Sequence, residues 1–451
     1  MNTKARLPLT SRGPITPRCR RAWLRMAVSA SLVLLGAVPA LHAGDTTRVS
    51  VNSAGVEGNG FSNAPVISAN GDGRYVTFYS NAPNLVSVDG NGVDDVFVHD
   101  QQTGVTTRVS VSSAGAEANG QSFSPSMSSD GRYVAFESGA SNLVSGDGNG
   151  ATDVFVHDRL NGQTTRVSVS SAGTEANGSS FASSISPDGR YVAFASGASN
   201  LVPGDGNGLA DVFVHDRQSG LTTRVSVSTA GVEANGASQS SSISSGGRFV
   251  AFESVASNLV SGDGNGQADV FVRDRQTGRT LRASVSSAGA EGNGGSARPS
   301  ISDNGRYVAF VFGGNNLVPA DGNFAADILV RDLQMGLTTR VSVDSAGAEA
   351  NNESDFPSIS DNGRFVAFAS NASNLVPADG NGLPDAFVHD RQSGKTVRVS
   401  VDSAGVEGNL GSSKPSITDS GRFVAFESQA TNLVPGDGNA ATDCFVHERS
   451  E

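Results

Sequence analysis

The chain has 451 residues, 55 of which are glycine, and its formal net charge is −12 at pH 7. Residues 1–43 hold seven of the 32 basic residues and none of the 44 acidic residues, so the remainder carries 25 − 44 = −19. This negative charge speaks against nucleic acid and anionic membranes as partners and is compatible with cation binding. The many glycines argue against helices.

Residues 1–43 have the pattern of a secretory signal peptide. Basic residues up to Arg25, with no acidic residue, precede a mildly apolar run, Met26–Ala40, and small residues end at Ala43. This run is too short for a membrane span. The segment around Arg20 and Arg21 resembles the twin-arginine export motif, and an ordinary Sec signal is the alternative. We therefore expect residues 44–451 to be periplasmic or secreted.

The rest of the chain is a repeat. The tripeptide T-x-R returns with a first step of 60 residues and five steps of 58, at Thr46, Thr106, Thr164, Thr222, Thr280, Thr338 and Thr396. A fixed period of this length predicts one supersecondary unit per repeat. No Pro-rich or charged linker interrupts the pattern, so we expect one domain over residues 44–451.

Each unit contains four short runs that are typical of strands. In the second unit, from inside to outside, they are Pro125–Ser128, Arg132–Ser138, Asp153–Arg159 and Thr164–Val169. The second and third runs are almost continuously apolar, as in strands buried on both faces. The fourth alternates, as in a half-exposed strand, and the first carries small side chains that suit a crowded centre. An Asp-Gly or Asn-Gly turn joins the first two runs.

These features predict an all-β, seven-bladed β-propeller with four antiparallel strands per blade. The runs S-x-S-x-D-G-R-Y-V-A-F, D-V-F-V-H-D-R-x-x-G and T-T-R-V-S-V resemble the WD40-like repeats of TolB-type propellers over essentially all of residues 46–451. The resemblance implies a fold, and that fold hosts many functions.

The two ends of the repeat complement each other. The first unit begins with an outer strand, Thr46–Val51, and the last unit stops after its third strand, Cys444–Arg449. We therefore predict that residues 46–51 pair with residues 444–449 and close the ring, which removes two exposed strand edges. Cys444 replaces the valine of D-V-F-V and is expected to be a buried apolar side chain.

Oxygen-bearing side chains recur in the long loops, which we expect on one face of the ring. The second-to-third-strand loop contains D-x-N-x-x-x-D, at Asp89, Asn91, Asp95, Asp147, Asn149, Asp153, Asp205, Asn207, Asp211, Asp263, Asn265, Asp269, Asp321, Asn323, Asp327, Asp379, Asn381, Asp385, Asp437, Asn439 and Asp443. The loop between blades contains A-G-x-E-x-N, at Glu57, Glu117, Glu175, Glu233, Glu291, Glu349 and Glu407. Such a set suits Ca²⁺, with carbonyls, water or the glutamate completing the shell. The alternative is that Asp and Asn shape turns and that the glutamate pairs with the arginine of T-x-R.

Five histidines occupy one repeat position on the third strand, at His99, His157, His215, His389 and His447, and two units carry Arg273 and Arg331 there. A position filled once per blade indicates scaffold, and histidines on different blades cannot converge on one metal. Serine is abundant, but no G-x-S-x-G elbow occurs. No catalytic residue is therefore predicted.

A unique ligand is better sought where the repeats disagree. The residues that enter the innermost strands are expected at the mouth of the central channel, and they include Phe123, Phe181, Arg298, Phe356 and Lys414 among Ser, Ala and Gln. Aromatic and cationic groups there could bind a carbohydrate, a peptide or an acidic group. The alternative is that the rings fill loops and the cations are solvated.

The leading hypothesis is a monomeric, non-catalytic propeller that binds an envelope or extracellular protein, or a glycan, through its long-loop face, with calcium as a stabilising ion. One alternative is a carbohydrate-active lyase or hydrolase with its site at the channel, since TolB-like blades also occur in some polysaccharide lyases. A second alternative, implied by the TolB resemblance, is a structural component of an envelope complex.

Overall fold

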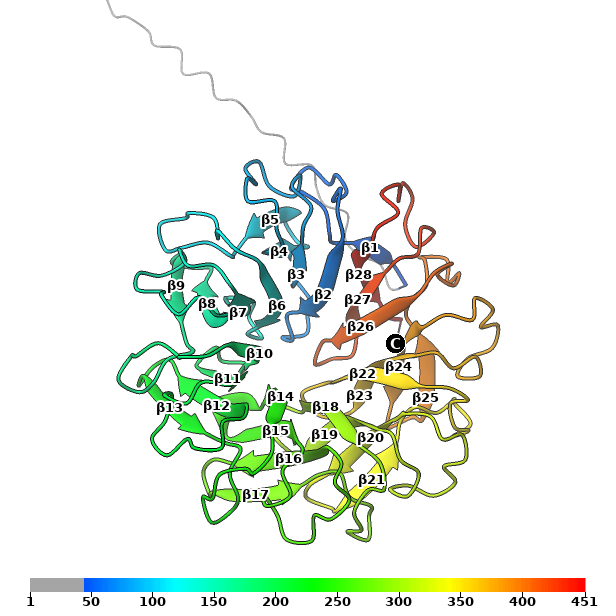
Figure 1. Cartoon of the computed structure of the whole chain (residues 1–451). Coiled ribbons are helices and arrows are strands. Elements are labelled where there is room, and N and C mark those ends of the chain that lie inside the picture. The colour runs from blue at the N-terminus through cyan, green and yellow to red at the C-terminus, as the bar shows by residue number, and fades with distance from the viewer. Residues whose placement is uncertain (1–43, 451) are drawn as a thin grey trace, which may run out of the picture. The chain divides into compact units, whose positions relative to one another are not determined.

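The computed structural model describes residues 44–450, in which 28 strands and one 3₁₀ helix, η1 (Ser245–Gly247), are present. The strands form seven four-stranded antiparallel sheets around a central channel (Figure 1). The predicted seven-bladed all-β propeller is therefore confirmed, and the predicted signal peptide lies outside the described residues. Among the residues that the structure describes, no helix has the length and apolarity needed to cross a membrane.

We number the blades 1–7 in chain order. The innermost strands are β2 (Ser62–Ile67), β6 (Ser122–Met127), β10 (Ser180–Ile185), β14 (Ser238–Ile243), β18 (Ser296–Ile301), β22 (Ser354–Ile359) and β26 (Ser412–Ile417). The second strands are β3 (Tyr75–Ser80), β7 (Tyr133–Ser138), β11 (Tyr191–Ser196), β15 (Phe249–Ser254), β19 (Tyr307–Phe312), β23 (Phe365–Ser370) and β27 (Phe423–Ser428).

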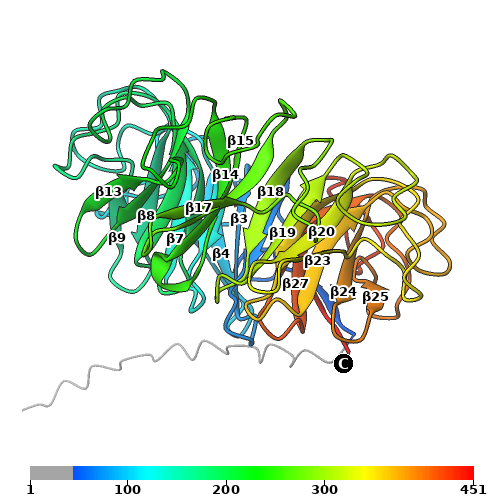
Figure 2. The same cartoon turned by 90° about the horizontal axis from the view of Figure 1, so that it is seen from below.

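The third strands are β4 (Asp95–Asp100), β8 (Asp153–Asp158), β12 (Asp211–Asp216), β16 (Asp269–Asp274), β20 (Asp327–Asp332), β24 (Asp385–Asp390) and β28 (Asp443–Glu448). The outer strands are β5 (Val105–Arg108), β9 (Gln163–Arg166), β13 (Leu221–Arg224), β17 (Arg279–Arg282), β21 (Leu337–Arg340), β25 (Lys395–Arg398) and, in blade 7, β1 (Thr46–Arg48). In side view the sheets stand beside one another around the ring (Figure 2).

Strand β1 completes blade 7, as predicted. It pairs antiparallel with β28, with Thr46 opposite His447 and Arg48 opposite Phe445. Beyond the strand, Ser50 donates a hydrogen bond to the carboxylate of Asp443, a side chain that is fully buried. The ring therefore closes through the N-terminal strand, and this closure is held by polar side chains as well as by the backbone ladder.

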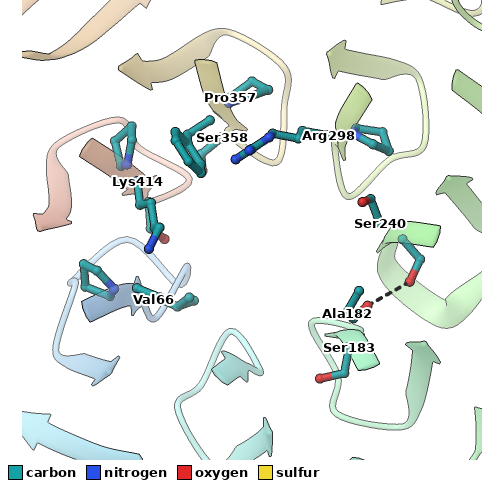
Figure 3. A pocket seen from close by; sticks show the side chains of 15 residues that line it. Val66, Ala182, Ser183, Ser240, Arg298, Pro357, Ser358 and Lys414 are labelled. Atoms are coloured by element: carbon teal, nitrogen blue, oxygen red, sulfur yellow. Dashed lines mark hydrogen bonds between the residues drawn. The ribbon is translucent and has the colours of Figure 1, made fainter. Parts of the chain in front are cut away.

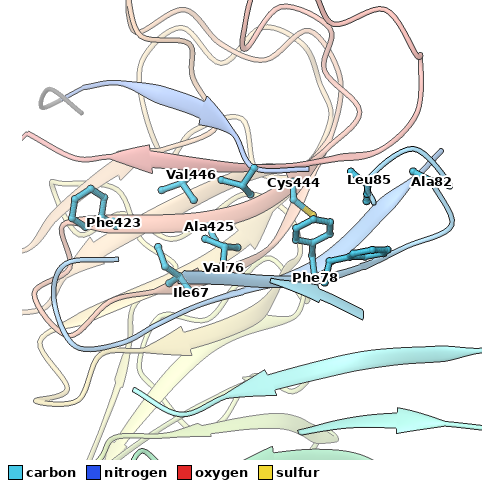
Figure 4. Close-up of a cluster of buried hydrophobic side chains, with 11 residues drawn as sticks. Ile67, Val76, Phe78, Ala82, Leu85, Phe423, Ala425, Cys444 and Val446 are labelled. Carbon is cyan, nitrogen blue, oxygen red and sulfur yellow. The ribbon is translucent and has the colours of Figure 1, made fainter. Parts of the chain in front are cut away.

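The hydrophobic core lies between neighbouring blades. At the junction of blades 7 and 1, Phe78 and Val76 pack in one cluster with Phe423 and Cys444 (Figure 4). Cys444 is fully buried, and burial raises the pKa of its thiol well above the usual value. Its role as an apolar core side chain is therefore confirmed. Each blade buries both faces against its neighbours, which explains the continuous apolar runs of the middle strands.

Two strand boundaries differ from prediction. The innermost strands begin earlier, as at Ser122, because an irregularity in the register lets the chain continue in the sheet across a β-bulge. The outer strands end at the arginine of T-x-R, as at Arg166. Beyond it the chain leaves the ladder, and Val169 makes an isolated bridge to Glu175 in the next loop.

Candidate functional site

The central channel contains a cavity of about 460 Å³ lined only by residues of the innermost strands. Figure 3 shows that its wall is uneven, with small side chains such as Ala182 and Ser240 on one side. On the other side the long side chains of Arg298 and Lys414 enter the cavity. The repeat therefore builds a nearly uniform ring, and one arc of the ring is distinct.

The bulge in each innermost strand decides which side chain faces the channel. Its central residue is left-handed in every blade, with φ between 47° and 54°, at Ala64, Ser124, Ala182, Ser240, Arg298, Phe356 and Lys414. This conformation is unfavourable for residues other than glycine. In two blades a glutamate of the preceding blade accepts a hydrogen bond from the amide of the bulge, from Ala182 to Glu137 and from Ala64 to Glu427, both at 2.8 Å.

The structure divides the five predicted channel-mouth residues. Arg298, Phe356 and Lys414 stand at the bulge and line the cavity. Phe123 and Phe181 stand one residue earlier, opposite Glu137 and Ala195 in the strand pairing, and they do not line this cavity. The prediction grouped them because it counted residues without the bulge. The proline that follows the bulge in blades 5–7, as in Arg298-Pro299, is a sequence signal that could have separated the two positions.

The two channel cations have weak partners. The guanidinium of Arg298 lies 4.0 Å from the ring centroid of Phe356, and its Nε lies 3.3 Å from Oδ1 of Asp355. The Nζ of Lys414 lies 3.2 Å from Oε1 of Glu427. The side chains of Arg298 and Lys414 are 47% and 34% exposed. Exposed ion pairs of this kind contribute about 0–1 kcal/mol, so a ligand could displace them.

The long loops also bring together the predicted metal-binding residues. In blade 3 the carboxylates are those of Asp205, Asp211 and Glu233, and the corresponding oxygen atoms of such groups lie within 4.8 Å of one another. These groups could therefore hold a metal ion. The contact between Gly206 N and Glu233 joins the two loops, which confirms that both lie on one face.

In each of these carboxylate triads the arginine of T-x-R already supplies a cation. The Nη1 of Arg224 lies 3.7 Å from Asp205 and 3.2 Å from Asp211, and it also donates to Glu233. The amide nitrogen of Asn207 donates to Asp211, and its Oδ1 accepts the Leu209 amide as in an Asx turn. The predicted pairing of the loop glutamate with this arginine is therefore confirmed.

Burial and ion pairing oppose each other in these triads. Removal from water raises the pKa of Asp211, whereas Ser226 and Arg224 lower it. In blade 5 Arg340 makes the corresponding ion pairs, 2.6 Å from Glu349 and 3.1 Å from Asp327. Both carboxylate oxygens of Asp321 are nevertheless buried without a hydrogen bond among the described residues, and its ion-pair distance to Arg340 is 3.6 Å. Asp321 is thus the least satisfied carboxylate of the set.

The five histidines are scaffold, as predicted. The hydroxyl of Thr222 donates to Val169 O, so it accepts the hydrogen bond from Nδ1 of His215 at 2.9 Å. In blade 4 the Nη1 of Arg273 donates to Thr280 at the same distance. Every blade therefore needs a donor at this position, and either residue type supplies it.

Substitution of His389 by arginine is expected to change the pH dependence of stability. Burial lowers the pKa of His389 from 6.5 to about 4. As pH falls from about 6.5 to about 4 the unfolded state binds a proton that the native state does not, so the free energy of unfolding falls by about 2 kcal/mol. Arginine stays charged in both states, so H389R removes this loss while keeping the donor.

Denaturant unfolding of wild type and H389R at neutral pH and near pH 4.5 measures the effect. Carboxyl groups such as Asp385, whose pKa burial raises to about 6, change the free energy of unfolding with pH in the direction opposite to His389. Their contribution is the same in both proteins, so it cancels when wild type and H389R are compared. A free-energy difference between the proteins that is the same at both pH values would contradict the assignment.

Comparison with known proteins finds similarity in fold. No family model and no curated protein matches the sequence. An oligogalacturonate lyase in complex with manganese matches with a TM-score of 0.54 and 12% identity, over 90% of this chain and 93% of that one. The β-propeller domain of the Trilobed protease from Pyrococcus furiosus matches with a TM-score of 0.53 and 10% identity, over 86% and 95%.

TolB from Acinetobacter baumannii is also among the matches, with a TM-score of 0.40 and 16% identity. The match spans 75% of this chain and 63% of the TolB chain. TolB proteins are thus among the similar structures, as the repeat predicted, and at these identities the similarities concern the propeller fold alone.

Proposed function

We propose that the protein is an exported, non-catalytic propeller that binds an acidic glycan at the mouth of its central channel, on the long-loop face. The observation that carries the proposal is the presence of two cations in the cavity wall. Arg298 and Lys414 occupy bulge positions where blades 1–4 have alanine or serine. They give one arc of the channel a chemistry that the rest of the ring lacks.

The class of ligand follows from charge and shape. Residues 44–451 carry only two lysines, and one of them lies in this cavity. Carboxylates pair well with guanidinium and ammonium groups, and the ring of Phe356 with Pro357 supplies an apolar surface beside them. The cavity volume lies within the range of about 300–1,000 Å³ that is common for ligand sites. Oligogalacturonate, named for the lyase of similar fold, is therefore the first probe.

The single substitutions R298A and K414A are each expected to weaken binding of an acidic oligosaccharide by about tenfold, since each removes a charge-assisted contact. Isothermal titration with oligogalacturonate measures the change. K395A is the matched control, because Lys395 is exposed at the start of outer strand β25, away from the cavity. Equal affinities for all four proteins would contradict the proposed site.

A lyase or hydrolase is the second candidate, and Glu137 is the observation that favours it. Burial raises the pKa of Glu137 to about 7, the range of a general acid or base. Its carboxylate contacts the bulge of blade 3, whose Ala182 lines the cavity. Chromatography of oligogalacturonate after incubation with the protein distinguishes the candidate functions. Cleavage that the substitution E137Q abolishes supports an enzyme. An intact, bound oligosaccharide supports binding alone, and capture of an envelope protein in its place supports the structural alternative.

We also propose that calcium stabilises the propeller, with blade 5 as the first site to be occupied. Six triads have an arginine that donates hydrogen bonds to their carboxylates. In blade 5 Arg340 is also present, but within residues 44–450 both carboxylate oxygens of Asp321 are buried without a hydrogen bond, and the ion-pair distance to Arg340 is 3.6 Å. Ca²⁺ prefers such oxygens. We therefore expect blade 5 to bind calcium before any other blade.

A further inference from the structure

A cation lies over an aromatic ring at most junctions between blades, which we call seams. The second strand of each blade begins with an aromatic residue, and the residue after the third strand of the next blade reaches it. In five seams that residue is an arginine whose guanidinium carbon lies 4.3–5.1 Å from the ring centroid, namely Arg159, Arg217, Arg275, Arg391 and Arg449. The seam is therefore a repeated arginine site.

Two groups contact each of these guanidinium groups. For Arg217 they are the ring of Tyr133 and the carbonyl of Gly189. The carboxylate of Asp158, which is paired with Arg132, adds a favourable charge nearby. The carboxylate belongs to the same blade as the ring, and the carbonyl belongs to the turn of the next blade. A planar cation that stacks on a ring and donates at its edge uses the ring and the carbonyl together.

Two seams lack the arginine. Between blades 7 and 1 the position is Gln101, whose side chain still donates to the carbonyl of Gly73. Between blades 4 and 5 it is Leu333, which has no donor. Within residues 44–450 nothing donates to the carbonyl of Gly305, the equivalent of Gly73.

A groove of about 280 Å³ is present at this seam, and Phe249, Asp274 and Gly305 all line it. The ring of Phe249 is half-buried. Phenylalanines at the same repeat position in blades 6 and 7, Phe365 and Phe423, are only 8% and 5% exposed. The seam between blades 4 and 5 thus presents the ring and the carbonyl without the arginine that contacts both elsewhere. Its carboxylate, Asp274, is already paired with Arg248, whose guanidinium lies 4.6 Å from the centroid of the Phe249 ring.

We propose that this groove is a docking site for an arginine side chain of a partner protein. The chain itself provides the template, because an equivalent ring and an equivalent carbonyl contact an arginine at five other seams. Leu333 fills the space of the arginine stem by packing against the core.

The surroundings of the groove favour a protein over a free small cation. The turn that carries Leu333 also carries Met335, which is 63% exposed, and Leu337 follows at 49%. Blades 1–4 and 6 have Thr, Asn or Ser at the position of Met335. Exposed apolar side chains beside a specific pocket are typical of protein interfaces.

Three cations at the groove oppose the proposal. Arg279 and Arg306 line it, and Arg248 lies 4.6 Å from the ring centroid of Phe249 and pairs with Asp274. Arg306 pairs with Asp332, whereas the exposed side chain of Arg279 has no hydrogen bond and no ion pair among the described residues. Because its side chain is free to point into solvent, we expect it to weaken arginine binding without preventing it. Preference of the groove for an anion through Arg279 is the competing outcome.

The test uses N-acetyl-arginine methylamide as the probe and N-acetyl-citrulline methylamide as its neutral isostere. Binding to residues 44–451 is followed by NMR, with phenylalanine ring signals assigned through F249L. The arginine probe is expected to bind at millimolar affinity and the citrulline probe at least about tenfold more weakly. The variant L333R restores the repeat and should abolish binding while raising the melting temperature.

Q101R is the matched control, since it adds an arginine at the other exceptional seam and should leave probe binding unchanged. Equal binding of the arginine and citrulline probes would overturn the proposal, and so would undiminished binding of the arginine probe to a folded L333R. The third contradicting result is preferential binding of the anionic probe N-acetyl-leucine that the substitution R279A abolishes. The melting curve of L333R shows separately whether that variant folds.

Discussion

Removing residues 44–52 is expected to destabilise the propeller by at least about 5 kcal/mol. The deletion takes away the outer strand of blade 7 and leaves a buried carboxylate without its cation. Strand β1 provides the backbone partner of β28, and Val49 behind it is buried. Ser50 and Arg48 are polar partners of Asp443. Without them the buried carboxylate keeps the hydrogen bond from Asn439 but loses its cation. The expected result is aggregation or a melting transition far below that of the intact ring.

The control is a chain that begins at Thr46, which keeps β1 complete. A synthetic peptide of residues 44–52, added to the shortened chain, should restore part of the stability, since it can pair with the free edge of β28. Thermal unfolding and light scattering follow both effects. Equal stability of the chains beginning at Thr46 and at Ser53 would show that the closing strand is dispensable.

The substitution R224Q is expected to cost about 3–5 kcal/mol, the usual effect of breaking a buried ion pair from one side. The side chain of Arg224 is 10% exposed, and it is the cation between the carboxylates of Asp205, Asp211 and Glu233. Glutamine cannot neutralise them. The cost should shrink at low pH, because burial raises the pKa of Asp211 and protonation there relieves the unpaired charge.

R190Q in the same blade is the matched control. Arg190 pairs with Asp216, but its side chain is 40% exposed, so its loss should cost no more than about 1 kcal/mol. Unfolding with calcium and with chelator adds a second comparison. We expect calcium to stabilise R224Q more than wild type, since the substitution frees the triad. A small and calcium-independent effect of R224Q would contradict the role of arginine as the resident cation.

Much of the fold could be predicted because the same strand pattern occurs in seven repeats. An ambiguous strand in one repeat can be assigned from the other six, and the incomplete first and last repeats complement each other in only one way to close the ring. The pairing of loop glutamates with T-x-R arginines was also accessible, since opposite charges recur at fixed repeat positions.

The site was less accessible, because its details depend on single-residue offsets. The bulge at Arg298, Phe356 and Lys414 turns those side chains into the channel and leaves Phe123 and Phe181 outside it. The Oδ1 of Asn207 accepts a hydrogen bond from the Leu209 amide in an Asx turn. The spacing of Asp and Asn in the sequence does not reveal this orientation of the side chain. The groove at Leu333 had a sequence signal, the loss of arginine from D-R-Q-x-G, but its meaning required the contacts of the other seams.

The most direct test of the proposed glycan site is a titration of residues 44–451 with oligogalacturonate and with a neutral oligosaccharide of the same length, at low and at high salt. We expect the acidic oligosaccharide to bind, added salt to weaken its binding, and the neutral oligosaccharide to bind at least about tenfold more weakly. Equal binding of both, or no binding of either, would contradict the assignment of the channel mouth as a site for acidic glycans.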